Sequence, residues 1–127
     1  MIIANAVSLN MIPPDVTSGG IIFRRISLTE AQRLVREANE IVSAIGHADT
    51  ARLVGRQLGV ELQADRRTVF LGDELTLVAQ YVGPRLPEGT TELPRGARIE
   101  WFLVRLATGE ELAGRGDMVF YPQGAGS

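Results

Sequence analysis

The sequence contains no cysteine, no lysine and only one histidine among its 127 residues. Without cysteine the chain can form neither disulfides nor thiolate metal sites, and one histidine with scattered carboxylates argues against a zinc or iron site. We therefore expect no metal ion and no other cofactor. No apolar run approaches the length of a membrane span, and no charged and apolar leader precedes a cleavage site. These features predict no membrane contact and a cytoplasmic location.

Excess positive charge is also lacking, because the formal net charge at pH 7 is −2. Binding to duplex DNA or RNA typically requires a basic face that neutralises many phosphates, so no duplex nucleic acid is expected as a partner. A small anion remains compatible with this charge. All 13 basic residues are arginine, which is typical of a GC-rich coding sequence but also suits bidentate phosphate contacts.

The length and the 45% hydrophobic content predict one compact domain. We assign residues 1–121 to this domain and residues 122–127, "PQGAGS", to a flexible tail. Patterns of apolar and β-branched residues predict strands at the start of segment 1–12 and at 20–27, 68–71, 75–82 and 97–106, with a final edge strand at 118–121. The "GDE" turn is expected to join the strands at 68–71 and 75–82.

Two helices are predicted between these strands. Ser27 and Glu30 have capping-box spacing at the start of the stretch 27–46. Apolar residues recur through that stretch at helical spacing, namely Ala31, Leu34, Val35, Ala38, Ile41 and Val42. A shorter helix is expected from Asp49 to Leu58, ended by Gly59. Strands that alternate with helices predict an α/β fold with a mixed sheet flanked by helices.

His47 lies directly before the first turn of the second predicted helix. Unpaired N–H groups and the helix dipole favour an anion at such a point, and Thr50 adds a hydroxyl donor. A histidine exchanges a proton readily near neutral pH, so this combination suggests phosphodiester chemistry. The alternative is that His47 caps the helix or packs beneath the first strand.

The segment 83–96, "GPRLPEGTTELPRG", is too long for a hairpin turn and is typical of a functional lid or a disordered loop. Arg85 and Glu88 are three residues apart between prolines, so they could form a preset ion pair that presents a guanidinium to a phosphate. A solvated surface pair is equally compatible with this spacing.

Short polar side chains follow the first strand at Asn5, Ser8 and Asn10. Such groups can bind a nucleobase edge or a ribose, but they also commonly form Asx turns. Arg66 and Arg67 precede the strand predicted at 68–71, where they either add positive charge to a site or only aid solubility.

Three blocks taken together, "ANAVSLNMI", "SAIGHADTARLV" and "PRLPEG", resemble the ring nucleases that viruses use as anti-CRISPR proteins against type III systems, and their cellular relatives. The blocks occur in the order and approximate spacing of that family. The resemblance implies a homodimer that binds the second messenger cyclic tetra-adenylate. It also implies metal-independent cleavage to linear di-adenylate with a 2′,3′-cyclic phosphate, which shuts off type III CRISPR signalling.

The resemblance also assigns roles to individual residues. His47 takes the position of the catalytic histidine, and Arg85 and Glu88 match the catalytic arginine and glutamate of a loop that closes over the ring. The residues implied to bind the ligand are Asn5, Ser8, Leu9, Asn10, Gly46, Asp49, Thr50, Arg66 and Gln80. The chain departs from the viral members in a shorter segment after "PRLPEG" and in its continuation beyond their usual end.

Two other functions are compatible with the same residues. One is a binding module that sequesters the cyclic oligoadenylate without useful turnover, for which no proton donor is needed. The other is a structural or regulatory protein without a nucleotide ligand, in which the three blocks only build core and turns. Substitution of His47 separates these alternatives, because only an enzyme depends on its proton.

Overall fold

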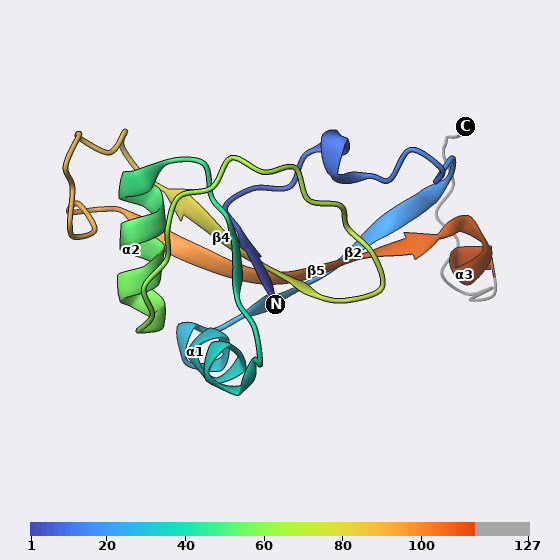
Figure 1. Cartoon of the computed structure of the whole chain (residues 1–127), viewed down its shortest axis with the longest axis horizontal. Coiled ribbons are helices and arrows are strands. Elements are labelled where there is room, and N and C mark those ends of the chain that lie inside the picture. Colours follow the sequence, from blue (N-terminus) through green and yellow to red (C-terminus); the bar gives the residue numbers. More distant parts are fainter. Residues whose placement is uncertain (114–127) are drawn as a thin grey trace.

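The computed structural model describes residues 1–113, so the edge strand predicted at 118–121 and the tail predicted at 122–127 lie outside the described residues. In chain order the elements are β1 (Ile2–Ala4), the 3-10 helix η1 (Leu9–Met11), β2 (Gly19–Ile26), α1 (Leu28–Glu37), β3 (Val42–Ala44), α2 (Ala48–Leu58), β4 (Thr76–Val82), β5 (Arg98–Thr108) and α3 (Gly109–Ala113). Figure 1 shows α2 and α3 at opposite ends of the sheet.

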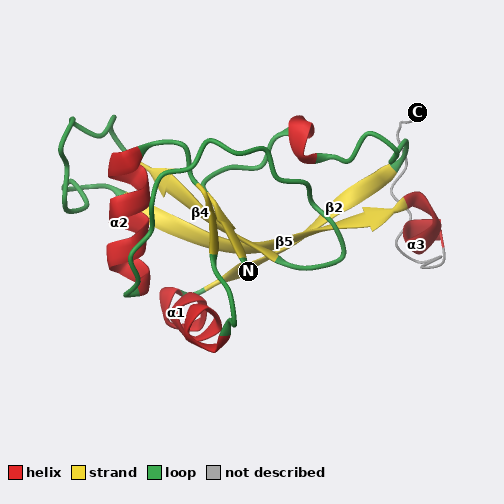
Figure 2. Ribbon diagram, in the orientation of Figure 1, coloured by secondary structure: helices red, strands yellow, loops and turns green. Residues whose placement is uncertain are grey.

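The strands form one five-stranded sheet in the order β2-β5-β4-β1-β3. β1 is parallel to both β3 and β4, whereas β5 is antiparallel to β2 and β4. The sheet is therefore mixed, and helices flank it (Figure 2). This arrangement confirms the predicted single-domain α/β fold with a mixed sheet.

The main core lies between one face of the sheet and the helices α1 and α2. Its fully buried side chains include Ile3, Leu77, Val54 and Ile45, which come from β1, β4, α2 and the turn that precedes α2. Since burial of each such side chain contributes roughly 1.5–3 kcal/mol, this layer fixes α2 firmly against the sheet.

The first helix is shorter than predicted, because α1 ends at Glu37 and residues 42–44 form the edge strand β3. The prediction that Ala38, Ile41 and Val42 continue the helical stripe is wrong. A short apolar run is compatible with the repeat of a helix and with that of a strand, and pairing with β1 made residues 42–44 a strand. The N–H of Val42 donates to the carbonyl of Met1 at 2.9 Å, which begins the parallel ladder. The expected cap is present, since the Ser27 side chain accepts from the Glu30 N–H at 3.1 Å.

The strand predicted at 68–71 is also absent from the described sheet. This segment instead crosses the face opposite the helices, where Leu71 is buried and Val69 packs beside it, whereas Phe70 is exposed. Its alternation of apolar residues therefore reflects packing on a face, since the N–H of Leu71 donates to the carbonyl of Met11 rather than to a strand. The hairpin predicted around the "GDE" turn is consequently wrong as well.

The second helix matches its prediction closely. α2 begins at Ala48 with His47 as its N-cap, and it ends at Gly59, whose φ of 80° is the left-handed C-cap geometry that glycine adopts without strain. Ala51, Val54 and Leu58 are buried on its inner side. Both ends of the helix are thus fixed by residue type, and its first turn is placed at the edge of the sheet.

Candidate functional site

The site is built where the parallel strands end. In the sheet register Ala4 of β1 lies beside Ala44 of β3 and Val78 of β4. The segments that follow these positions therefore reach the same edge of the sheet, and they contain Asn5, His47 and the long loop after β4. Ligands of open α/β sheets bind at this carboxyl edge.

His47 is the N-cap residue of α2, with extended backbone angles of φ −112° and ψ 132°. Its carbonyl accepts the N–H of Ala51 at 2.9 Å, but its side chain makes no capping hydrogen bond. The residue is exposed rather than packed beneath β1. The alternative that His47 packs beneath β1 is therefore wrong, whereas His47 does cap α2, but through its backbone alone, so the capping role leaves the imidazole unused.

A cavity of about 740 Å³ opens beside this histidine. It lies between the first turn of α2, the end of β4 and the loop that follows β4. The residues that line it are His47, Asp49, Thr50, Tyr81, Gly83, Arg85, Leu86, Pro87 and Glu88. All three residues with a predicted catalytic role thus face one space, together with two of the predicted ligand residues.

Arg85 and Glu88 are both exposed on the loop. Within residues 1–113 neither side chain makes an ion pair, so the preset pair expected from their spacing does not form. Bonds to proline carbonyls shape this part of the loop instead: the Tyr81 hydroxyl donates to Pro84, and the Thr90 N–H donates to Pro87 at 3.2 Å. The guanidinium of Arg85 therefore remains available to a ligand.

The base of the loop closes tightly at Gly83. A Cβ at this position would lie 2.7 Å from the Cβ of Ala97, and the φ of 153° disfavours any side chain. Since only glycine permits this approach, Gly83 brings the two ends of the loop together. The loop consequently projects beside α2, where Figure 1 shows it as the gold segment.

Asp49, a predicted ligand residue, is already engaged within the protein. One carboxylate oxygen accepts from the Arg52 guanidinium at 3.0 Å, and the other accepts from the backbone N–H of Gly89 in the loop at 3.0 Å. The side chain is 27% exposed. Asp49 thus connects the first turn of α2 to the loop that faces it.

Gly46 and Arg66, two residues predicted to bind the ligand, contact each other. The Arg66 Nε donates to the carbonyl of Gly46 at 3.2 Å, and a Cβ on Gly46 would lie 3.2 Å from the Arg66 Cγ. Because Gly46 has no side chain, it leaves room for the aliphatic part of the Arg66 side chain. This contact places a guanidinium one residue from the histidine, although Arg66 does not line the cavity itself.

The N-terminal block lies elsewhere at the same edge. Ser8 is the N-cap of η1, and its N–H approaches the Met11 sulfur at 3.4 Å, whereas Leu9 is 80% exposed. Gln80 donates to the backbone carbonyl of Tyr81 at 3.2 Å, and it shares with Val7 a separate hollow of about 340 Å³. Within a single chain, the cavity beside His47 is lined by none of the following predicted ligand residues: Asn5, Ser8, Leu9, Asn10 and Gln80.

Sequence reasoning missed several residues of the site. Tyr81 lines the cavity and holds the start of the loop, and Gly89 supplies the N–H that Asp49 accepts. The only available signal for Tyr81 was its position as the last aromatic residue before the loop. Nothing in the sequence indicated the bond to Gly89, because its partners are 40 positions apart.

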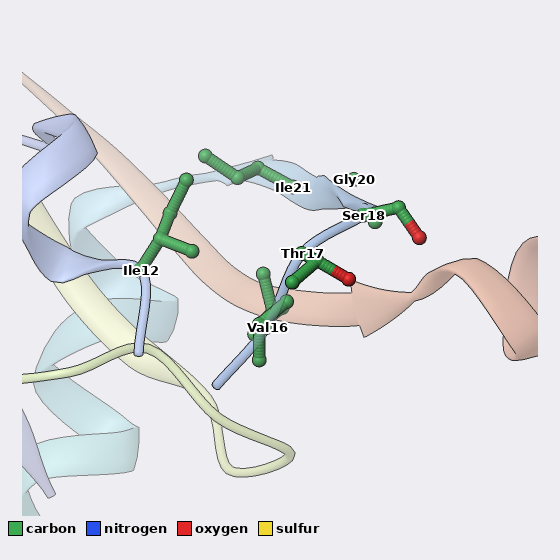
Figure 3. Close-up of a pocket in the computed structure, with 8 residues that line it drawn as sticks. Ile12, Val16, Thr17, Ser18, Gly20 and Ile21 are labelled. Atoms are coloured by element: carbon green, nitrogen blue, oxygen red, sulfur yellow. The ribbon is translucent and has the colours of Figure 1, made fainter. Parts of the chain in front are cut away.

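Another cavity, of about 390 Å³, lies near the opposite end of the sheet. It is lined by the segment 16–20 together with Ile12, Ile21 and Leu106, and Figure 3 shows the apolar side chains of Ile12, Val16 and Ile21 around it. It contains none of the predicted site residues. Its lining carries no charged side chain, so it is poorly suited to a phosphate.

Residues 1–113 contain neither a metal-binding cluster nor a membrane-spanning helix. They bring together no three histidine, aspartate or glutamate side chains in an arrangement that could hold a metal ion. In the same part of the chain, the helices are all too short or too polar to span a bilayer.

A model of the STIV B116-like family matches residues 1–96 of the chain. The chain belongs to the STIV B116-like family. It is 38% identical over 68 residues to the uncharacterized protein ORF117 of Acidianus two-tailed virus, a match that spans 51% of this chain and 56% of that protein. The fold is similar to B116 of Sulfolobus turreted icosahedral virus, with a TM-score of 0.64 at 26% identity over 82% of this chain and 97% of B116.

The STIV B116-like region contains every residue that was assigned to the site, because all of them lie within residues 1–96. It also includes the complete loop that follows β4. ORF117 and B116 are both viral proteins.

Proposed function

We propose that this STIV B116-like protein is a metal-independent ring nuclease that binds cyclic tetra-adenylate and cleaves it, which shuts off type III CRISPR signalling. The observation that carries the proposal is the shared cavity. The imidazole of His47, at the N-terminus of α2, lines a space of about 740 Å³. Arg85 and Glu88 line the same space from the loop after β4, and neither makes an ion pair within residues 1–113. The identity of the proposed ligand is inferred from the resemblance of the three sequence blocks to viral ring nucleases.

The reaction needs no external nucleophile, because each ribose 2′-hydroxyl is adjacent to the phosphate that it attacks. The 2′-oxygen forms a bond to phosphorus and loses its proton to solvent, while the bond from phosphorus to the 5′-oxygen breaks. Protonated His47 donates a proton to this leaving oxygen, a role worth about 10²- to 10⁴-fold in rate. The products are a 5′-hydroxyl and a 2′,3′-cyclic phosphate, and a second cut yields two di-adenylates.

The other residues of the cavity stabilise and orient the reacting phosphate. Arg85 and the free N–H groups of the first turn of α2 oppose the extra charge that develops on the phosphate oxygens. Glu88 orients Arg85 or His47 once the ligand is bound. The loop 83–97 covers the ring and holds the 2′-hydroxyl in line with the leaving oxygen.

A homodimer completes the proposal, since a ring of identical units offers equivalent phosphates to two symmetric sites. The sheet face opposite α1 and α2 is the surface best suited to the second copy. Phe23 is 65% exposed there, with Phe102 beside it at a ring distance of 6.1 Å and Ile21 nearby. Gln80 and Val7 border the same face, so dimerisation would bring the N-terminal blocks of both copies close to the ligand.

The decisive experiment incubates the purified protein with cyclic tetra-adenylate in excess EDTA and resolves the products by chromatography. Wild type is compared with His47→Ala and with Arg36→Ala, a control that removes an exposed side chain from α1. We expect di-adenylate with a cyclic phosphate from wild type and the control. His47→Ala should bind the ring but cleave it at least 100-fold more slowly.

The other outcomes discriminate between functions. If all proteins bind the ring and none cleaves it, the protein is a sequestering module rather than an enzyme. If none binds, the ligand is wrong and the ring-nuclease proposal fails. The dimer is tested separately by the mass of wild type and Phe23→Ser in solution, and a monomeric wild type would contradict the two-copy site.

A further inference from the structure

Two hydrogen bonds attach the loop after β4 to other described elements: the Tyr81 hydroxyl of β4 donates to the Pro84 carbonyl at the base of the loop, and the Gly89 N–H donates to Asp49 of α2. Among residues 85–96, only the N–H of Gly89 donates to a group outside the loop, and its acceptor is the Asp49 carboxylate at 3.0 Å. The other hydrogen bonds of the segment join Thr90 to Pro87 and Ala97 to Pro94, within or at the end of the loop. Beyond Pro84, the described hydrogen bond that joins the loop to α2 thus depends on one carboxylate.

Asp49 is well placed for this contact. It lies in the first turn of α2, where the positive end of the helix dipole favours a carboxylate. Arg52, one turn further along the helix, pairs with the other oxygen of the carboxylate at 3.0 Å and so fixes its orientation. The backbone N–H of Gly89 then meets an ionised and oriented acceptor, which gives a stronger bond than a neutral acceptor would.

We propose that Asp49 is a positioning residue that latches the loop 84–90 over the cavity of His47, rather than a group that contacts the ligand. The inference rests on the proposed function for its catalytic consequence, but the latch itself is a property of the free protein. Both oxygens of Asp49 are already committed, and a carboxylate would repel a phosphate. Closing the loop brings Arg85 and Glu88 toward the space that His47 faces.

The latch acts on catalysis through Arg85 and Glu88. When the loop is already held against α2, these side chains reach the phosphate beside His47 with little further loss of conformational entropy in the loop. When the latch is removed, the open loop leaves the ring accessible but poorly oriented. We therefore expect kcat to fall more than KM rises.

The test compares wild type with Asp49→Ala, Asp49→Asn and Arg52→Ala. Amide hydrogen exchange in the free protein measures loop opening directly, at Gly89 and across residues 84–90. Asp49→Ala should exchange there about tenfold faster, as expected for loss of one charge-assisted hydrogen bond that is partly exposed. Asp49→Asn keeps an acceptor oxygen and should restore most of the protection, and Arg52→Ala, which removes only the partner that orients the carboxylate, should fall between wild type and Asp49→Ala. Unchanged exchange in β5 would show that each variant remains folded.

Ring cleavage by the same four proteins provides the second readout. A kcat about tenfold lower in Asp49→Ala, recovered in Asp49→Asn, supports the latch as a positioning device. Unchanged exchange at Gly89 in Asp49→Ala overturns the latch whatever the activity, and faster exchange with an unchanged kcat overturns its link to catalysis. Faster exchange in a protein whose wild type does not cleave the ring would support the latch while refuting the proposed function.

Discussion

Gly55 lies in the interior of α2, where a change to alanine would ordinarily stabilise a protein. Alanine is favoured over glycine inside a helix by roughly 0.5–1 kcal/mol, because glycine loses more conformational freedom on folding. Propensity alone therefore predicts that Gly55→Ala raises the free energy of unfolding by up to about 1 kcal/mol.

The structure reverses that expectation. A Cβ on Gly55 would lie 2.6 Å from the carbonyl oxygen of Val60 and 3.2 Å from the backbone nitrogen of Leu62. These atoms belong to backbone that folds back over the helix after Gly59, and the N–H of Val60 is itself bonded to the Gly55 carbonyl at 3.0 Å. Leu62 is 9% exposed in the core, so the segment has little room to withdraw.

The steric cost therefore exceeds the gain in helix propensity. Overpacking of this kind costs about 2 kcal/mol, the middle of its usual range, so we expect Gly55→Ala to lower the free energy of unfolding by about 1 kcal/mol after the propensity gain is subtracted. The measurement is urea unfolding followed by the fluorescence of Trp101, the single tryptophan, which is 4% exposed. Gly72→Ala is the matched control, because its Cβ would meet nothing within 4 Å, and it should change stability by less than about 0.5 kcal/mol.

A Gly55→Ala protein as stable as wild type, or more stable, would refute this reasoning. It would mean that residues 60–62 do not pack on α2 as described. Because α2 carries His47 at its start, the same variant also reports on the site. A displaced helix should reduce the proposed ring cleavage even where the protein remains folded.

Three further predictions follow from single contacts. Ser27→Ala removes the side-chain acceptor for the first turn of α1 and should destabilise the protein by about 1 kcal/mol in urea unfolding. Leu53→Ala removes a side chain that is only 2% exposed, and it should cost about 2–5 kcal/mol in the same assay. The pKa of Glu100 is held below its usual range, chiefly by a hydrogen bond from Arg98 and also by Arg25, so the contribution of its carboxylate to stability is present at neutral pH and lost in acid. Glu100→Gln should thus be less stable than wild type at pH 7, with the difference vanishing as pH falls below the carboxyl range; a difference that persists in acid would contradict this.

Much of the candidate site was predictable because its signals are local. The N-cap position of His47 follows from the glycine before it and the helical pattern after it, and Gly59 marks the end of the same helix. The loop after β4 was recognisable from its prolines and glycines alone. These features depend on a few neighbouring residues, so a sequence pattern is sufficient to locate them.

The errors share a different origin. Residues 38–42 satisfy the helical period, yet residues 42–44 became a strand because the backbone of β1 offered a parallel partner. Residues 68–71 alternate as a strand does, but they packed across a sheet face instead of pairing with an edge strand. In both cases the local pattern allowed two structures, and a distant segment selected one of them.

The sequence alone thus determined the elements whose ends are set by capping residues and turn residues, together with the residue types that could act on a phosphate. Only the tertiary structure decided which of those residues share a cavity. The parallel register of β1, β3 and β4 brings three distant segments to one edge, and the bond from Gly89 to Asp49 joins positions 40 residues apart. Such contacts depend on how the whole chain buries its apolar surface, which no short stretch of sequence specifies.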